Sequence, residues 1–242
     1  MTETKKACCK KKPTSNMYAD VKTWNPFKGC KFDCEYCKPS FQLQAKRQKN
    51  RCTLCYNFEP HTHPDRLDKI PSADTIFVCG NGDISFCDPK FTIEIIESIK
   101  KDNLKKRRKT FFLQSKRPAY FQQFLDKLPD NVKLITTLET NRDIGYKTIS
   151  KAPVPSVRYK QFLGLNYPHK ILTVEPIMDF DLKEFSEMII DLKPELVHMG
   201  VNSRHKSLQL LEPTPKKFEQ LKTKLIKSGI NVKMMNDIGS RK

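Results

Sequence analysis

No run of 18 apolar residues occurs in the 242-residue sequence, which excludes a membrane-spanning helix. The sequence also has no apolar segment ahead of its cysteines, because it opens with Met-Thr-Glu-Thr-Lys-Lys-Ala-Cys-Cys, so we expect no secretory signal peptide. We therefore expect a cytoplasmic, reducing location, in which the nine cysteines stay free or bind metal instead of forming disulfides.

Acidic residues are scarce relative to basic ones. The sequence has 27 Asp and Glu against 45 Lys and Arg, a formal net charge of +18 that exceeds what solubility requires. Nucleic acid and other polyanions are therefore candidate partners, although charge alone does not distinguish among them. The length suits one sizeable core. We expect a basic flexible tail over residues 1–16 and one domain over residues 17–242, with an insertion over residues 38–72.

Three cysteines carry the strongest chemical signal. Cys30, Cys34 and Cys37 form a C-x3-C-x2-C set directly after an extended segment that ends in Thr-Trp-Asn-Pro. Three such thiolates can hold three irons of a [4Fe-4S] cluster and leave the fourth iron open for the amino and carboxylate groups of S-adenosylmethionine (SAM). This spacing is the radical SAM signature. A zinc knob usually supplies four ligands in C-x2-C pairs, and a disulfide framework needs an oxidising compartment.

Strand and helix patterns alternate along the rest of the chain. Short apolar or β-branched runs predict strands at residues 18–23, 75–79, 110–114, 132–138, 170–174 and 196–200, with a seventh candidate at 231–235. Helical spacing is clearest at residues 91–101, 119–128, 182–192 and 215–228. Alternation of this kind predicts an α/β fold with parallel strands, and six or seven strands fit a partial (β/α)6 barrel.

Polar residues follow nearly every predicted strand. Because the carboxyl ends of parallel strands meet at one edge, we expect these residues to share a site with the cysteine loop. The residues that follow the second to sixth strands are Gly80, Gly82 and Asp83; Gln114 to Arg117; Glu139 to Arg142; Glu175; and Asn202 to His205.

The turn of Gly80, Gly82 and Asp83 is a candidate for binding SAM. A carboxylate or a backbone carbonyl in this turn could accept the SAM ammonium group. The alternative is a plain strand-to-helix turn in which glycine supplies a positive φ.

Three later carboxylate and amide side chains are further cofactor-binding candidates. Glu139 and Asn141 could accept hydrogen bonds from the ribose hydroxyls of SAM, or Asn141 could cap a helix. Glu175 precedes a proline that ends its strand, so its side chain is expected to point into the barrel mouth or to pair with Lys116 or Arg117.

A second set of metal-ligating residues lies in the expected insertion. Cys52, Cys55, His61 and His63 form a C-x2-C-x5-H-x-H set that suits zinc, although the histidines follow the cysteines more closely than in most zinc fingers. An auxiliary Fe–S centre and a purely structural His63 are the alternatives. Cys79 and Cys87 are most simply interpreted as small core residues.

Basic residues fall into two groups. The dense run at 100–109 precedes the third strand, so we expect it at the end of the barrel away from the cysteines, where a solvated helix end would explain it. Phosphate contacts are expected instead from a basic set on the cysteine side, namely Lys116, Arg117, Arg142, Arg204, His205, Arg241 and Lys242.

The motifs together resemble the phage-type radical SAM proteins described as partners of a three-Cys-motif partner protein. The resemblance covers roughly residues 20 to 205. Its shared blocks are Thr-Trp-Asn-Pro with Gly-Cys at 23–30, His-Pro-Asp-Arg-Leu at 63–67, Gly-Asp at 82–83, Gln-Ser-Lys-Arg-Pro at 114–118, Leu-Glu-Thr-Asn at 138–141 and Val-Glu-Pro at 174–176. The chain departs from the family in lacking a glycine-rich turn after its last barrel strand, and Cys52 and Cys55 lie outside the shared blocks.

The resemblance implies a radical SAM partial barrel, a [4Fe-4S] cluster and SAM, but no substrate. We expect an enzyme that cleaves SAM to methionine and a 5′-deoxyadenosyl radical and acts on nucleic acid, in repair or base modification. A small anionic metabolite is the alternative substrate, and a non-catalytic, metal-stabilised nucleic-acid-binding module is the alternative class. Expected partners are an electron donor such as ferredoxin or flavodoxin and a three-Cys-motif partner protein. The catalytic residues stay unassigned.

Overall fold

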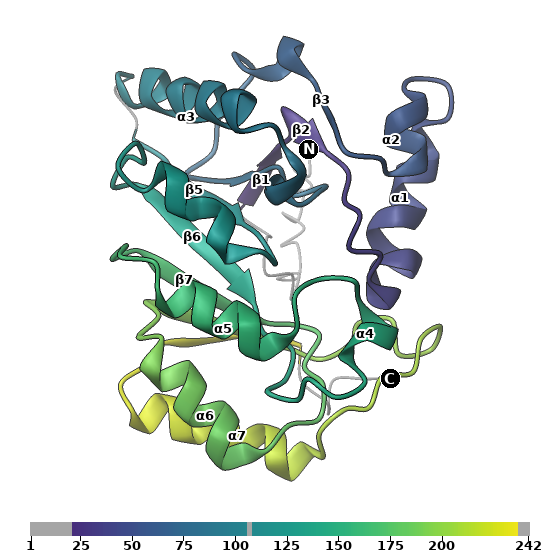
Figure 1. The fold of residues 1–242 in the computed structure, drawn as a ribbon, viewed down its shortest axis with the longest axis vertical. Coiled ribbons are helices and arrows are strands. Elements are labelled where there is room, and N and C mark those ends of the chain that lie inside the picture. The colour runs from purple at the N-terminus through teal and green to yellow at the C-terminus, as the bar shows by residue number, and fades with distance from the viewer. Residues whose placement is uncertain (1–20, 106–107, 237–242) are drawn as a thin grey trace, which may run out of the picture.

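A computed structural model describes residues 21–105 and 108–236 of the chain. Its main feature is a seven-stranded sheet in the order β1-β4-β5-β6-β7-β8-β9, in which every neighbouring pair is parallel. The sheet curls into an open half-barrel (Figure 1). Its strands are β1 (Val21–Trp24), β4 (Thr75–Val78), β5 (Thr110–Gln114), β6 (Val132–Thr137), β7 (Lys170–Val174), β8 (Leu196–Gly200) and β9 (Val232–Asn236).

Helices cover the outer face of the half-barrel (Figure 1). Several begin with proline in the first turn, where its missing N–H costs nothing, and the side chains of Asp88 and Thr214 cap α3 and α7. The outer helices are α3 (Pro89–Asn103), a 3-10 helix at Pro118–Phe124, α5 (Pro155–Leu163), α6 (Leu182–Asp191) and α7 (Pro215–Lys227). Short helices at Ile84–Phe86 and α4 (Tyr146–Ile149) lie in loops.

The two faces of the sheet have different surroundings. Outward side chains such as Phe111 and Leu134 pack in the main core together with helix residues such as Ile95. Other side chains of the sheet, including Phe77, Ile135 and Ile171, form a separate apolar cluster. Toward the carboxyl ends the inward positions become polar, and Thr23, Gln114, Thr137 and Thr173 line a cavity. The fold thus directs its polar interior positions to one edge of the sheet.

The segment after β1 forms a smaller unit beside the barrel. It contains a two-stranded antiparallel sheet of β2 (Phe27–Lys28) and β3 (His61–Thr62). Figure 1 shows α1 and α2 apart from helices α3, α5 and α6. Its short helices are a 3-10 helix at Glu35–Cys37, a π-helix at Lys38–Gln42, α1 (Leu43–Ala45), a 3-10 helix at Lys46–Gln48, α2 (Thr53–Asn57) and a 3-10 helix at Pro64–Arg66.

Six of the seven strands predicted from sequence agree with the structure within two residues at each end. The first prediction, 18–23, begins outside the described residues, as does the predicted tail over 1–16. The predicted helix at 119–128 is a 3-10 helix at Pro118–Phe124 instead, and α5 was not anticipated because its proline start and nine-residue length give a weak periodic signal. Among the described helices, none combines the length and apolar character needed to cross a membrane.

Candidate functional site

A cavity of about 980 Å³ opens at the carboxyl ends of the strands. It is lined by the loop of Cys30, Cys34 and Cys37 and by Glu175 and Arg204. The cavity is also lined by Gly80, Gly82, Asp83, Gln114, Lys116 and Asn202. The cysteine loop and residues that follow the second, third, fifth and sixth predicted strands therefore border one cavity. Glu139, Asn141, Arg117, Arg142 and His205 are not among the lining residues.

The cysteine loop is held by contacts from three parts of the chain. Gly29 has a φ of +91°, which favours glycine, and Cys30 N–H donates to the Phe58 carbonyl at 3.2 Å. Cys37 N–H donates to the Cys34 carbonyl at 2.9 Å, and Cys34 Sγ lies 3.0 Å from the Ser150 hydroxyl. These contacts hold the loop in place against the rest of the chain.

The electrostatic surroundings of the three thiols differ. A hydrogen bond from Cys37 outweighs burial and lowers the pKa of Cys34 to about 6, with help from the Lys116 charge and the Ser150 hydroxyl. Burial, reinforced by the Asp83 charge, raises the pKa of Cys30. Lys116 favours the thiolate of each cysteine. A buried cation beside three cavity-lining thiols is the charge arrangement that an anionic thiolate-ligated cluster needs, so the residues fit a [4Fe-4S] group.

Glu139 is the centre of a buried polar network behind the cysteine loop. Its side chain is fully buried. Oε1 accepts from Lys116 Nζ at 2.6 Å, from the Tyr36 hydroxyl at 2.5 Å and from the Tyr146 hydroxyl at 3.1 Å, while Oε2 accepts from Arg158 at 2.6 Å. Burial opposes ionisation, but the charges of Arg158 and Lys116 hold the pKa of Glu139 well below its usual range. The carboxylate therefore links the loop, through Tyr36, to the barrel.

Arg158, Tyr146 and Ser150 are site residues that sequence reasoning missed. Arg158 is fully buried, donates to the Thr137 carbonyl at the end of β6 as well as to Glu139, and lies 4.9 Å from the centre of the Tyr146 ring. None of the three falls in a recognisable motif. A fully buried arginine in a helix that carries few other signals can be identified only once its carboxylate partner is known.

The turn after β4 packs directly against the cysteine loop. Gly29 N–H donates to the Asn81 carbonyl at 3.0 Å, and Asp83 N–H donates to the Gly29 carbonyl at 3.1 Å. A Cβ on Gly82 would lie 2.5 Å from the Gly29 carbonyl oxygen, and a Cβ on Gly80 would lie 2.1 Å from the Phe77 ring. Glycine is therefore required at both positions by close approach rather than by a positive φ.

The Asp83 carboxylate already has protein donors. Oδ1 accepts from the Ser115 hydroxyl at 2.7 Å and from Ser85 N–H at 3.0 Å, and Oδ2 accepts from Lys116 N–H at 2.8 Å. These bonds join the turn after β4 to the loop after β5. Of the two groups considered in this turn, the side chain is engaged, whereas the Gly80 carbonyl accepts no hydrogen bond among the described residues.

Asn141 faces away from the cavity. Its amide donates to Glu184 at 2.7 Å, and its side-chain oxygen accepts from Asp181 N–H at 2.9 Å, at the start of α6. The neighbouring Arg142 forms ion pairs with Asp179 and Asp181. The loop after β6 is thus tied to α6.

Glu175 is a carboxyl group of the cavity that has neither a hydrogen-bond donor nor a charged partner among the described residues. It lies at the end of β7, lines the cavity and forms no hydrogen bond or ion pair with the described residues. The expected alternative, a salt bridge to Lys116 or Arg117, is not present, because Lys116 pairs with Glu139. Burial alone raises the pKa of Glu175 to about 7. A carboxyl group in this state can bind a cation or exchange a proton near neutral pH.

The basic set expected on this side is only partly available to a ligand. Lys116 and Arg142 are engaged with carboxylates of the protein. The exposed Arg117 guanidinium lies over the Phe32 and Phe86 rings at 5.4 and 5.3 Å. Arg204 is exposed, lines the cavity and has no ion pair among the described residues. Arg241 and Lys242 lie outside the described residues.

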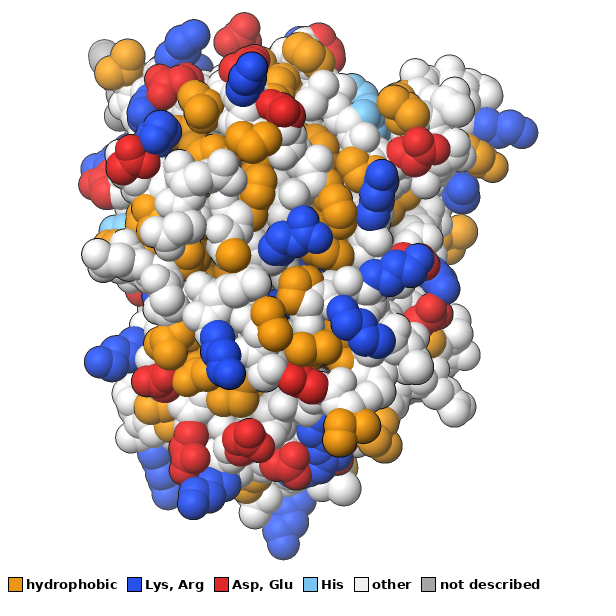
Figure 2. All heavy atoms as spheres, viewed as in Figure 1, with side chains coloured by type: hydrophobic (Ala, Val, Ile, Leu, Met, Phe, Trp, Pro, Cys, Tyr) orange, Lys and Arg blue, Asp and Glu red, His pale blue; other side chains and the backbone are white. Residues whose placement is uncertain are grey.

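The dense basic run at 100–109 lies at the amino end of β5, away from the cavity, as expected. Its described charges are largely paired: Lys105 and Lys109 with Asp102, Lys100 with Glu97, and Arg108 with Asp130. Figure 2 likewise shows basic side chains distributed over one face of the molecule among acidic ones. The run therefore has the character of a solvated helix end.

The other cysteines among the described residues are buried or clustered. Cys79 and Cys87 belong to the main core, as expected, and Cys79 also borders the cavity. The donor atoms of Cys52, Cys55, His61 and His63 all lie within 4.8 Å of one another. The predicted C-x2-C-x5-H-x-H set is thus brought together at one point.

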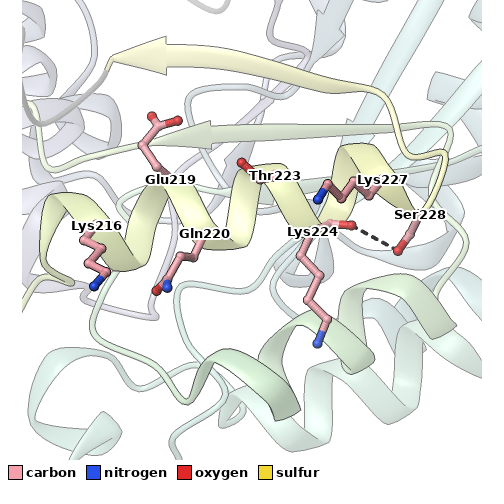
Figure 3. A pocket seen from close by; sticks show the side chains of 7 residues that line it. All are labelled: Lys216, Glu219, Gln220, Thr223, Lys224, Lys227 and Ser228. Atoms are coloured by element: carbon pink, nitrogen blue, oxygen red, sulfur yellow. Dashed lines mark hydrogen bonds between the residues drawn. The ribbon is translucent and has the colours of Figure 1, made fainter.

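A second hollow lies along α7 and is unrelated to this site. Its lining residues all come from this one helix and its cap, so no other element contributes a group that converges on it (Figure 3). We assign no function to this hollow.

The half-barrel has counterparts among solved structures. Spore photoproduct lyase complexed with dinucleoside spore photoproduct matches with a TM-score of 0.58 and 11% identity, over 88% of this chain and 75% of that chain. A mutant of that lyase with the same ligand has a TM-score of 0.60 and 12% identity, over the same shares of the two chains. A radical SAM methyltransferase from Sphaerobacter thermophilus has a TM-score of 0.58 and 14% identity, over 89% of this chain and 65% of that chain.

Comparison with protein-family models and with curated proteins gave no match. At the low identities of the structural matches, the likeness shows the fold. The prediction of an α/β partial barrel of the radical SAM type is confirmed. Membership of the phage-type family stays a prediction.

Proposed function

We propose that this protein is a radical SAM enzyme in which Cys30, Cys34 and Cys37 hold a [4Fe-4S] cluster. The observation that carries the proposal is the position of these three thiols on the wall of a large cavity at the carboxyl ends of a half-barrel. When bound, the cluster supplies the electron that cleaves SAM to methionine and a 5′-deoxyadenosyl radical. The protein supplies binding, orientation and exclusion of water.

SAM binding is proposed to use two groups that have no partner within the described part of the chain. The Gly80 carbonyl and the Glu175 carboxylate both border the cavity and accept no hydrogen bond among the described residues. Each could accept from the SAM ammonium group or from a ribose hydroxyl. Asp83 would act indirectly, since its carboxylate holds the turn that presents the Gly80 carbonyl.

Glu139 and Asn141 are proposed to position the site instead of binding ribose. Four donors already satisfy the Glu139 carboxylate, and Asn141 is bonded to the start of α6. Neither residue lines the cavity. Glu139 would hold the cysteine loop in place through Tyr36, and it would hold the positive charge of Lys116 close to the three thiolates.

The proposed substrate class is nucleic acid, in repair or base modification. Arg204, exposed and unpaired among the described residues at the cavity edge, is the group best placed to bind a phosphate. The spore photoproduct lyase with a similar fold is complexed with a dinucleoside, which adds support. A small anionic metabolite would use the same arginine and is the second candidate. A ferredoxin or flavodoxin as electron donor and a three-Cys-motif protein as partner remain part of the proposal.

Anaerobic reconstitution tests the enzyme class. The reconstituted protein should bind about four irons per chain, become brown, and convert SAM to 5′-deoxyadenosine when reduced with dithionite. A colourless protein that retains zinc alone and leaves SAM intact would identify a non-catalytic module instead. The substrate is then identified by following deuterium between 5′-deoxyadenosine and candidate oligonucleotides or metabolites.

A further inference from the structure

The small unit between β2 and β4 has almost no hydrophobic core. Across residues 35–70, Ala45 and Cys55 are the buried residues, whereas Leu43 and Leu54 are exposed. Its longest helical stretch, residues 35–48, changes along its length from 3-10 to π, to α and back to 3-10 geometry, and its sheet has two strands of two residues each. Units of this size seldom hold a fixed conformation by packing alone, and structural metals are a common substitute for a core.

Two thiols and two imidazoles converge in this unit. His61 Nε2 lies 3.4 Å from Cys52 Sγ and 3.3 Å from Cys55 Sγ, and His63 Nε2 lies 3.3 Å from Cys55 Sγ. Around one tetrahedral zinc ion, with bonds of about 2.3 Å to sulfur and about 2.0–2.1 Å to nitrogen, neighbouring sulfur and nitrogen ligands are about 3.5 Å apart. Three of the six donor pairs therefore already have the spacing of a zinc site, and all four donor atoms lie within 4.8 Å of one another.

The surroundings of the donors are those of ligands. His61 Nδ1 lies 2.7 Å from the Glu59 carbonyl; when Nδ1 carries the proton and donates to this oxygen, the lone pair of Nε2 faces the sulfurs. Cys52 caps α2 and accepts from Cys55 N–H at 3.3 Å, an N–H to sulfur bond that stabilises a thiolate. Cys55 is buried, whereas Cys52 and both histidines are partly exposed, which leaves an entry path for the ion.

We propose that Cys52, Cys55, His61 and His63 bind one structural Zn²⁺ ion. Two thiolates and two neutral imidazoles satisfy a closed tetrahedral site, so the site has no open position for catalysis. The donor set belongs to this unit and includes none of Cys30, Cys34 and Cys37. The site is therefore separate from the proposed cluster.

The zinc site would brace the cysteine loop through backbone contacts. Phe58 and Glu59 lie between the two pairs of ligands: Phe58 accepts from Cys30 N–H, and Glu59 packs so closely on Gly29 that a Cβ there would lie 2.0 Å from the Glu59 carbonyl oxygen. His63 N–H donates to the Pro26 carbonyl at 2.6 Å. The metal would thus fix the backbone that leads into the first cluster cysteine, Cys30.

Metal analysis of the full chain tests the site. Protein purified anaerobically with zinc supplied, then desalted, should contain about one zinc per chain, and Co²⁺ in place of zinc should give tetrahedral d–d bands with thiolate charge transfer. The C52S and H63A variants should each lose most of the zinc. The C87S variant, which removes a buried cysteine outside both sets, should retain it.

A variant without the cluster ligands separates this proposal from the proposed function. The triple variant C30S/C34S/C37S should still bind about one zinc per chain, even if the protein never forms a cluster. Folded wild-type protein without zinc or with a Cys52–Cys55 disulfide would overturn the proposal. So would a drop from about eight irons per chain in wild type to about four in the C52S protein, because that result would identify an auxiliary cluster at these residues. The wild-type stoichiometry and the Co²⁺ spectrum keep the test valid if a variant fails to fold.

The proposal that the zinc site braces the cysteine loop is tested by a separate measurement. This part of the inference rests on the proposed function. Zinc removal by a chelator should lower the thermal midpoint, expose the 38–66 segment to protease and speed loss of iron from the reconstituted protein. Unchanged protease cleavage and unchanged iron retention in zinc-free protein would contradict the bracing role, whatever substrate the enzyme has.

Discussion

The Tyr36 hydroxyl donates to Glu139 Oε1 at 2.5 Å and thereby joins the middle of the cysteine loop to the end of β6. Tyr36 lies between the second and third cysteines, and Glu139 also binds Lys116 and Arg158. The Glu139 carboxylate therefore connects the cysteine loop to the positive charges of Lys116 and Arg158 in the barrel. Its loss should affect both folding and any cluster that the loop holds.

Replacing Cys34 by alanine should abolish both the cluster and SAM cleavage. A three-ligand site loses one iron ligand with any single cysteine, and Cys34 is also the thiol whose pKa falls to about 6. Iron content, absorption near 400 nm and 5′-deoxyadenosine formation are the measurements. Cys87→Ala is the matched control, since that thiol is equally buried but belongs to the outer core. Normal SAM cleavage in the Cys34→Ala protein would refute the assignment of the cluster.

The Glu139→Gln variant should be markedly less stable than wild type. Removing the charge leaves Lys116 and Arg158 buried without their anion, and breaking a buried pair typically costs about 3–5 kcal/mol. Urea unfolding of the apo-protein measures this loss. Glu97→Gln, which breaks an exposed pair with Lys100, should cost less than about 1 kcal/mol. Similar losses of unfolding free energy in the two variants would mean that the buried Glu139 network stabilises the fold no more than an exposed ion pair does.

The Glu139 network also makes the stability of the fold depend on pH. The folded-state pKa of Glu139 is depressed, so its contribution to stability is present above the unfolded pKa and is lost as pH falls toward the folded value. Acid titration of stability should therefore be steeper in wild type than in Glu139→Gln. Parallel acid profiles for the two proteins would argue against the depressed pKa.

Glu175 should make the stability of the fold depend on pH in the opposite direction. Its folded pKa of about 7 lies above the ordinary 4.5, so the folded state favours the protonated carboxyl group, and stability should fall as pH rises through this window. The full effect is at most about 3 kcal/mol. Glu175→Gln should flatten the profile and be more stable than wild type at pH 8.

The same variant tests the proposed SAM contact. A carboxylate that accepts from the SAM ammonium group should bind it more tightly as pH rises through about 7, and its loss should weaken binding by roughly 10- to 100-fold. Isothermal titration of SAM into the reconstituted protein at several pH values measures this. Equal affinity in wild type and Glu175→Gln would remove Glu175 from the SAM site.

Gly82→Ala should displace the cysteine loop. Its Cβ would lie 2.5 Å from the Gly29 carbonyl oxygen, so backbone must move on one side or the other, at a cost of about 1–3 kcal/mol. Lower iron content after reconstitution should accompany the lower stability. Gly164→Ala is the control, because its nearest neighbour would be 3.4 Å away. A Gly82→Ala protein with full iron content would show that the close approach is not needed.

Arg204 should contribute to nucleic-acid binding if the proposed substrate class is right. Loss of one phosphate contact should flatten the slope of log K against log salt by roughly 0.7 to 0.9. Lys105→Ala, in the dense run where Lys105 already pairs with Asp102, should leave the slope unchanged. Fluorescence anisotropy with a labelled oligonucleotide at several salt concentrations measures both. An unchanged slope for Arg204→Ala would favour a small anionic metabolite as substrate.

The positions of the strands, and the edge of the sheet at which the site lies, could be predicted from local patterns in the amino-acid sequence. Short apolar or β-branched runs such as 110–114 and 170–174 are local signals, and the parallel order of the strands brings their carboxyl ends together. The C-x3-C-x2-C spacing is equally local, as is the C-x2-C-x5-H-x-H set. For this reason the half-barrel, the cysteine wall of the cavity and the convergence of Cys52 with His61 could all be expected from the chain.

Which polar groups remain available to a ligand could be seen only from the three-dimensional contacts. Asp83, Glu139 and Glu175 follow strands in the same way in the sequence, yet Asp83 and Glu139 are saturated by protein donors and Glu175 has none among the described residues. The difference depends on partners far away in the chain, such as Arg158, which carries no motif. Whether a buried carboxylate is neutralised depends on charges within a few ångströms, and the fold alone brings those charges together.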